Sequence, residues 1–282
     1  MKVGVSFPTV IDSPVDPVAF ARKAEEVGFE SMWVPEHPVL PVHSSSRFPG
    51  SADGRVPDTY SYMMDPFVAL SAASAVTTTL KLATGICLVP ERNTILLAKL
   101  IASLDHYSGG RFIFGIAAGW LREETELMGG DFEHRWTQTR EQVEAMKELW
   151  TREEPEFHGR YVDFPSVRCY PKPVQKPHPP VLLGGRARNV FQRVVRWGDG
   201  WFPNRITPEE VREGREALDG LAKAAGRDPA SVSISISGQS PDRDLIAGFG
   251  EAGAVRVVLQ GQGDSTQGAL RWLEEAAGKV LG

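Results

Sequence analysis

The chain has 282 residues, of which 41% are hydrophobic and 24% charged, and these are ordinary values for a globular protein. Its formal net charge of −5 excludes a strong basic field that would attract nucleic acid or an anionic membrane. No apolar stretch approaches the roughly 20 residues needed to span a bilayer, and residues 1–5 enter a strand-like pattern without a signal-peptide core. Cys87 and Cys169 form neither a metal motif nor a disulfide framework, so we expect a cytoplasmic protein with no metal site.

Strand-like and helix-like segments alternate along the chain. Apolar runs predict eight strands, in chain order at residues 3–7, 32–34, 80–86, 111–116, 181–183, 200–202, 232–236 and 255–259. Helical patterns fill the intervals, and three of them start with an N-cap residue followed by proline, at Asp16, Asp65 and Thr207. Strict alternation favours a parallel sheet, and eight such units predict one α/β domain over residues 1–282, a (β/α)8 TIM barrel. A doubly wound open sheet is the alternative.

Two stretches interrupt the alternation. Residues 35–64 are rich in proline, serine and glycine and lack periodicity, which predicts a lid loop. Residues 153–180 contain seven prolines and a short patch at 157–164, which predicts an irregular insertion with a small hairpin.

The carboxyl ends of the strands face one pocket if the barrel closes. Glu36 and His37 follow the second strand, and such a pair can hold a proton or polarise a carbonyl, although a plain surface loop would have the same sequence. Small residues at the next three ends would let a flat ligand approach the backbone. These ends are Thr84, Gly85 and Ile86, then Ala117, Ala118, Gly119 and Trp120, then Gly184 and Gly185. A helix follows Gly185, so free N–H groups there and Arg186 can bind a phosphate.

Taken in order, several fragments resemble the luciferase-like flavin monooxygenase superfamily, and in particular its coenzyme F420-dependent oxidoreductases. The fragments are residues 27–37, 82–86, 90–93, 104–112, 119–124, 179–185 and 198–201. The resemblance covers nearly the whole chain and implies a luciferase-like TIM barrel with an insertion over the C-terminal face.

The resemblance also implies roles for the strand ends. Glu36 and His37 would flank the reactive edge of the cofactor ring. Residues 84–86 would back the ring, with a non-prolyl cis bond at Gly85–Ile86. Residues 117–119 would contact the ring, and residues 184–186 would take the cofactor phosphate.

The activity implied is hydride transfer between coenzyme F420 and a small-molecule substrate. His37 would bind the substrate oxygen or supply a proton, and Glu36 would orient the ring edge or fix the His37 tautomer. Phe7, Trp120 and Trp201 would form walls of the pocket. The resemblance also suggests a homodimer, for which Leu96, Leu97 and Leu100 are candidate contacts, although they equally fit an ordinary core.

Three other functions remain open. F420-dependent members more often carry Asp at the position of Glu36, which keeps an FMN-dependent two-component monooxygenase, using reduced flavin and oxygen, as the main alternative. A carbohydrate-active barrel would use Glu36 with Glu123 or Glu124 as a carboxylate pair. A member that binds a flavin-like ligand without turnover is the last alternative.

Overall fold

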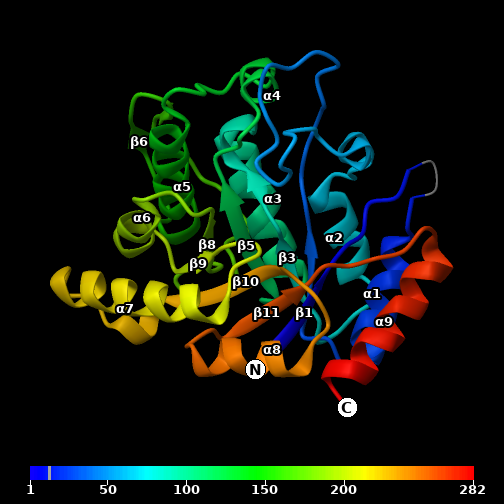
Figure 1. The fold of residues 1–282 in the computed structure, drawn as a ribbon. Coiled ribbons are helices and arrows are strands. Elements are labelled where there is room, and N and C mark those ends of the chain that lie inside the picture. The colour runs from blue at the N-terminus through cyan, green and yellow to red at the C-terminus, as the bar shows by residue number, and fades with distance from the viewer. Residues whose placement is uncertain (12–13) are drawn as a thin grey trace.

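A closed barrel of parallel strands forms the centre of the computed structural model, which describes residues 1–11 and 14–282 (Figure 1). The strands are β1 (Lys2–Ser6), β2 (Ser31–Val34), β3 (Lys81–Thr84), β4 (Cys87–Leu88), β5 (Phe112–Ala117), β8 (Val181–Gly184), β9 (Gly200–Phe202), β10 (Ser233–Gln239) and β11 (Arg256–Leu259). β3 and β4 are two parts of one interrupted strand, because both pair with β5. The order β3-β2-β1-β11-β10-β9-β8-β5 therefore makes eight positions, and the β3–β5 pairing closes the ring. The predicted TIM barrel is confirmed.

Helices surround the barrel. They are α1 (Pro17–Glu26), α2 (Pro66–Ser74), α3 (Thr94–Tyr107), α4 (Arg122–Leu127), α5 (Arg135–Thr151), α6 (Val190–Trp197), α7 (Pro208–Ala224), α8 (Arg243–Glu251) and α9 (Thr266–Val280). The three predicted start signals are confirmed, since Asp16 and Asp65 cap α1 and α2, and Thr207 forms a capping box with Glu210 at the start of α7. Short 3₁₀ helices lie at η1 (Asp58–Tyr62), η2 (Val89–Glu91) and η3 (Pro229–Ser231).

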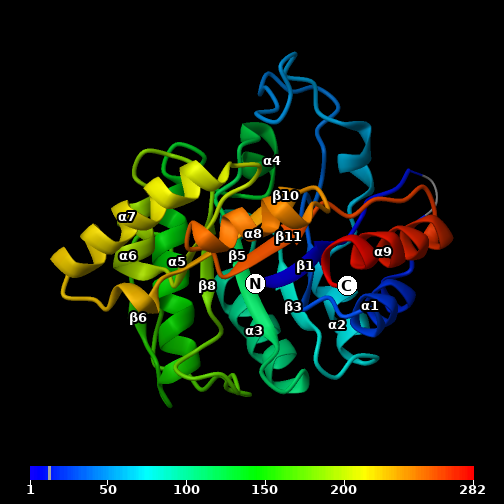
Figure 2. The ribbon, with the colours of Figure 1, turned by 60° about the horizontal axis from the view of Figure 1, so that its bottom comes forward.

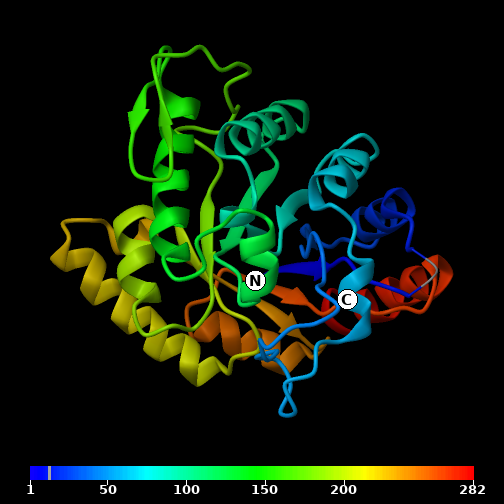
Figure 3. The same ribbon diagram turned by 90° about the horizontal axis from the view of Figure 1, so that it is seen from above.

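The two irregular stretches lie at different places on the barrel. Between β2 and η1, residues 35–57 form no helix or strand, and Figure 2 shows this loop rising beside α4. In the second stretch, β6 (Phe157–His158) and β7 (Asp163–Phe164) pair antiparallel as the predicted hairpin. Figure 3 shows the hairpin alongside α5.

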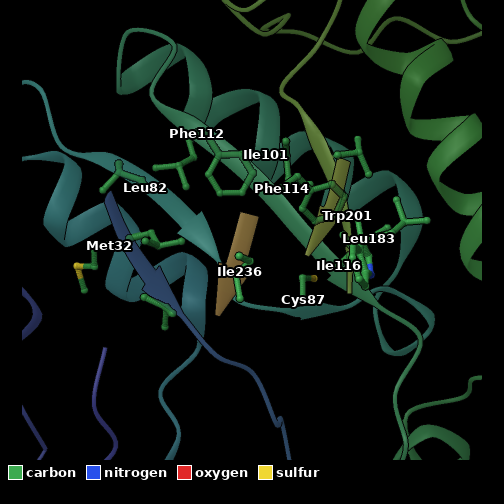
Figure 4. Close-up of a cluster of buried hydrophobic side chains, with 14 of the residues drawn as sticks. Met32, Leu82, Cys87, Ile101, Phe112, Phe114, Ile116, Leu183, Trp201 and Ile236 are labelled. Atoms are coloured by element: carbon green, nitrogen blue, oxygen red, sulfur yellow. The ribbon is translucent and has the colours of Figure 1, made fainter. Parts of the chain in front are cut away.

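Side chains from alternate strand positions fill two separate layers. The barrel interior holds Trp33, Ala83, Ile113, Leu182, Phe202 and Val258, and the Trp33 and Phe202 rings stack with centroids 4.3 Å apart. The larger layer lies between strands and helices, where Figure 4 shows Leu82, Phe112, Phe114 and Leu183 among its members.

Trp201 and Phe7 both pack in that larger layer. This corrects the expectation that Phe7 forms a pocket wall, whereas Trp201 also lines a groove between α6 and α7. Trp201 of β9 points away from the barrel interior, and its ring packs edge-on against Phe191 of α6. The Phe7 ring packs edge-on against Phe20 of α1. Both aromatic rings therefore fasten helices to the barrel.

Three further findings concern the described residues. None of their helices is long and apolar enough to cross a membrane. Cys87 and Cys169 are buried free thiols. No three His, Cys, Asp or Glu side chains in residues 1–11 and 14–282 gather in a way that could hold a metal ion.

Candidate functional site

His37 lies just beyond β2 and is held by a carboxylate from α4. Its ring Nδ1 is 2.6 Å from Oε2 of Glu124, whose side chain is fully buried. The other Glu124 oxygen accepts a hydrogen bond from the Val39 N–H at 3.3 Å. Because an ionised carboxylate only accepts hydrogen bonds, Nδ1 of His37 carries the hydrogen and Nε2 is left for a ligand.

Glu36 lies on the other side of the same strand end. It is 3% exposed, and it accepts hydrogen bonds from the Leu88 N–H and from Nε of Arg92, each at 2.7 Å. Arg92 also pairs with Asp65, so it joins the N-cap of α2 to the end of β2. Burial lowers the pKa of Arg92, but the Glu36 carboxylate outweighs this and keeps the pKa above its usual value.

The expectation that Glu36 fixes the His37 tautomer is therefore wrong, and Glu124 makes that contact. Consecutive residues leaving a strand point to opposite sides, so adjacent positions cannot both face the same partner. The role of Glu36 at a ring edge stays a prediction.

Aromatic side chains from the lid loop and from the end of β5 cover His37. The centroid of its ring is 4.9 Å from that of Tyr60 and 5.8 Å from that of Trp120. Phe48 completes the group, 5.2 Å from Tyr60 and 5.4 Å from Trp120. The His37 side chain is only 7% exposed, so a substrate that reaches Nε2 must displace part of this cover.

Glu123 fastens the lid loop to α4. One of its oxygens accepts hydrogen bonds from the N–H and hydroxyl of Ser45 at 2.7 and 2.8 Å. The other accepts from the hydroxyls of Ser44 and Ser46 at 3.0 and 2.7 Å. Hydrogen bonds from Ser46 and Ser45 hold the pKa of Glu123 well below its usual range, which keeps the carboxylate charged.

The candidate carboxylate pair of a carbohydrate-active enzyme receives no support from this arrangement. Glu36 is bound by Arg92, Glu123 by the serines of the lid loop, and Glu124 by His37. A retaining glycosidase needs two carboxylates directed at one bond.

Three of the predicted strand ends converge on Gly184. A Cβ at this position would lie 3.4 Å from Cγ2 of Ile86 and 3.7 Å from Cβ of Ala117. The Gly85–Ile86 bond is cis, as the resemblance implies. Thr84 is fully buried and donates its hydroxyl to the Gly115 carbonyl at 2.7 Å, so it belongs to the barrel wall.

The remaining predicted residues lie around this group. Gly119 has φ +81°, and a Cβ there would lie 3.0 Å from Oγ1 of Thr125 and 3.2 Å from Oε1 of Glu91, so a side chain would be strained and crowded. Ala118 beside it is buried. Gly185 has φ +99° and space at its Cβ position, and its carbonyl accepts a hydrogen bond from Nε1 of Trp201 at 2.8 Å.

Arg186 is separated from the strand-end group by its own ion pair. Its guanidinium contacts Glu210 of α7. Both residues line a groove of about 370 Å³ between α6 and α7, which also contains Arg188 and Phe191. A ligand phosphate at Gly185 would therefore compete with Glu210 for Arg186.

Sequence reasoning missed the partner of His37 and most of its cover. The Glu123-Glu124 pair is visible in the sequence, but the contact between His37 and Glu124 spans 87 positions. Phe48 and Tyr60 lie in a loop without periodicity, so no pattern places their rings on the imidazole.

Comparisons with known proteins relate the whole chain to one family of enzymes. The sequence profile of the luciferase-like monooxygenase family matches residues 1–240. An uncharacterised protein of Mycobacterium tuberculosis is 39% identical over 276 residues, which is 95% of each chain. An F420-dependent glucose-6-phosphate dehydrogenase of Amycolatopsis mediterranei is 27% identical over 84% of this chain and 69% of its own length. An FMNH2-dependent dimethylsulfone monooxygenase of Pseudomonas putida is 30% identical over 50% of this chain and 39% of its own length.

Solved structures share the fold. A monooxygenase of Streptomyces bottropensis superposes with a TM-score of 0.79 at 22% identity, covering 100% of this chain and 99% of the other. The coenzyme F420-dependent tetrahydromethanopterin reductase of Methanopyrus kandleri superposes with a TM-score of 0.74 at 16% identity, with the same coverage. At these identities the likeness concerns the barrel alone.

Proposed function

Because the chain belongs to the luciferase-like monooxygenase family, whose members are oxidoreductases or monooxygenases, we propose that it transfers a hydride between coenzyme F420 and a small organic substrate. The F420-dependent relative aligns over 84% of this chain, whereas the FMNH2-dependent one aligns over 50%. This difference in coverage favours F420 over FMN.

The strand ends fit a flat ring. Ile86, Ala117 and Gly184 present small or apolar groups close to one another, and the apolar cluster of Trp33, Phe202 and their neighbours fills the barrel interior. The space at the Cβ position of Gly185 suits a phosphate, and Arg186 would add a charge by exchanging Glu210 for it. When bound, the cofactor supplies the carbon that gives or takes the hydride.

The His37–Glu124 pair is the observation on which this proposal rests. Nδ1 of His37 is held by a buried carboxylate, which leaves Nε2 to bind the substrate oxygen. As charge develops on that oxygen, His37 supplies or accepts the proton, and Glu124 stabilises the charged imidazole. Phe48, Tyr60 and Trp120 exclude water from the pair.

Direct titration tests the cofactor. We expect oxidised F420 to bind at tens of micromolar or tighter, followed by its fluorescence, and FMN to bind more weakly. If neither redox form of F420 binds in that range, the hydride-transfer proposal fails. If instead reduced FMN binds and oxygen is consumed in the presence of a flavin reductase, the protein is a monooxygenase.

A matched pair of variants tests the role of His37 in proton transfer. His37→Asn is expected to keep F420 binding within about threefold and to lower turnover by about 100-fold or more, which is the usual contribution of a general acid or base. His158→Asn, at an exposed histidine of the β6–β7 hairpin, is the control and should change neither. Equal turnover in the two variants would remove His37 from the mechanism.

A further inference from the structure

Three pairs of consecutive residues, one of which contains His37, form a closed ring of contacts. The pairs are Glu36-His37 at the end of β2, Glu91-Arg92 at η2, and Glu124-Thr125 in α4. Each carboxylate is bound by the second residue of another pair. Arg92 binds Glu36, the Thr125 hydroxyl donates to Oε1 of Glu91 at 2.9 Å, and His37 contacts Glu124 at 2.6 Å.

Glu91 is the carboxylate of the ring whose only hydrogen-bond partner is a hydroxyl. Glu36 has Arg92 and Glu124 has His37, but Glu91 receives only a neutral hydroxyl. It is 3% exposed, and its Oε2 has no hydrogen-bond partner among the described residues. A buried carboxylate in this position would lack both solvent and a counter-charge, which strongly favours its neutral form.

The groups around Glu91 act in the same direction. Burial and then the negative charge of Glu124 raise the pKa of Glu91 to about 8. The Thr125 hydroxyl opposes them, and Glu36 and Arg92 make smaller contributions of opposite sign. From α5, the neutral amides of Gln138 and Gln142 donate to the Pro90 and Arg92 carbonyls at 3.3 and 3.0 Å, and the guanidinium of Arg135 donates to the Gly119 carbonyl at 3.0 Å rather than to Glu91. No described residue on that side supplies a cation to Glu91.

We propose that Glu91 is a positioning residue, a buried acid that stays protonated at neutral pH and so leaves Glu124 as the one charged partner of His37. With Glu91 neutral, the ring holds two carboxylates, of which Glu36 contacts Arg92 and Glu124 contacts His37. When Glu91 ionises, a further negative charge lies near Glu124, the carboxylate that contacts His37, and this charge holds a proton on the imidazole more tightly. Glu91 thereby limits proton release from His37 to the pH range below the pKa of Glu91. This inference rests on the proposed role of His37.

The full-length protein without cofactor is suited to the first test. The ring ¹⁵N resonances of His37, identified by their loss in His37→Asn, are followed from pH 5 to 10. We expect these resonances to shift in a step near pH 8 in the wild type, where Glu91 ionises. Glu91→Gln should abolish that step and keep the fold, because its amide oxygen still accepts from Thr125. Glu126→Gln, an exposed position on α4, is the control and should leave the step in place.

Thr125→Val gives an independent check should Glu91→Gln fold poorly. It removes the hydroxyl that favours the ionised form of Glu91, so the step should move to higher pH. If the wild type shows no step near pH 8, if the step survives in Glu91→Gln, or if it does not move in Thr125→Val, the proposal is overturned. Because the titration uses no cofactor, its failure is distinct from a failure to bind F420.

Discussion

Glu36 and Arg92 form a buried ion pair whose members also bind other parts of the site. Glu36 accepts the Leu88 N–H of β4, and Arg92 reaches Asp65 at the start of α2. Removing one partner of a buried pair leaves an uncompensated charge, whereas removing both charges together costs much less. The pair therefore fixes the strand end from which His37 projects.

A double-mutant cycle measures this coupling. Arg92→Met is expected to lower the free energy of unfolding by about 3–5 kcal/mol, because it leaves Glu36 buried and unpaired. The double variant with Glu36→Gln should recover a large part of that loss, since the Gln oxygen still accepts from Leu88. Urea denaturation gives the values. Asp65→Asn, at the half-exposed end of the network, is the control and should cost at most about 1 kcal/mol. Strictly additive effects of the Glu36 and Arg92 changes would contradict the coupling.

Glu91 makes the stability of the protein fall as pH rises through the neutral range. Its pKa is raised from the ordinary 4.5 to about 8 in the folded state. Below pH 4.5 the carboxyl is protonated in both states, and between 4.5 and 8 only the unfolded chain ionises, which favours unfolding. The unfolding free energy of the wild type, measured relative to that of Glu91→Gln, should therefore fall by roughly 3.5 kcal/mol from pH 5 to 8. Urea titrations at pH 5, 6, 7 and 8 measure it, and a pH-independent difference would show that Glu91 ionises normally.

At the scale of elements, α4 carries two neighbouring carboxylates that bind different parts of the site. Glu123 binds Ser44, Ser45 and Ser46 of the lid loop, and Glu124 binds His37. One short helix therefore contacts both the lid loop and the imidazole. In Figures 1 and 2 the loop and α4 lie side by side above the barrel.

Loss of the Glu123 contacts should loosen the lid loop without unfolding the barrel. Glu123→Ala removes four hydrogen bonds to Ser44, Ser45 and Ser46. We expect hydrogen exchange in residues 41–57 to rise by about tenfold, equivalent to roughly 1.4 kcal/mol of local stability. Glu126→Ala, three positions along α4, should leave that segment unchanged. Equal exchange in the two variants would mean that the serine contacts do not hold the loop closed.

The elements were predictable from local signals, and the site was predictable only in part. The caps at Asp16, Asp65 and Thr207 act within their own helices, so the sequence around each one suffices. The partners of Glu36 and His37 lie 56 and 87 positions away, and nothing local tells which of the two adjacent residues turns toward α4. The same one-residue alternation placed Phe202 in the barrel interior and Trp201 outside it.

At the scale of the whole molecule, four exposed aliphatic side chains lie on the neighbouring helices α2 and α3. Leu96 is 65% and Val68 is 68% exposed, and Ile95 and Leu100 are exposed on the same stretch of α3. Leu97, between them, is buried in the core, so only two of the three leucines that we considered as dimer contacts reach the surface. α2 and α3 are neighbours and both start at the C-terminal end of the barrel, so these residues make one apolar face.

That face leads us to expect a homodimer. Light scattering at tens of micromolar should give about twice the 30.9 kDa mass of the chain. Leu96→Glu places a charge at the centre of the apolar face and should give the monomer mass, because an unpaired charge buried in an interface costs several kcal/mol. Val174→Glu introduces the same charge at an exposed valine of the insertion and should remain dimeric. A wild type that runs as a monomer would mean that α2 and α3 present this face to another partner or to water.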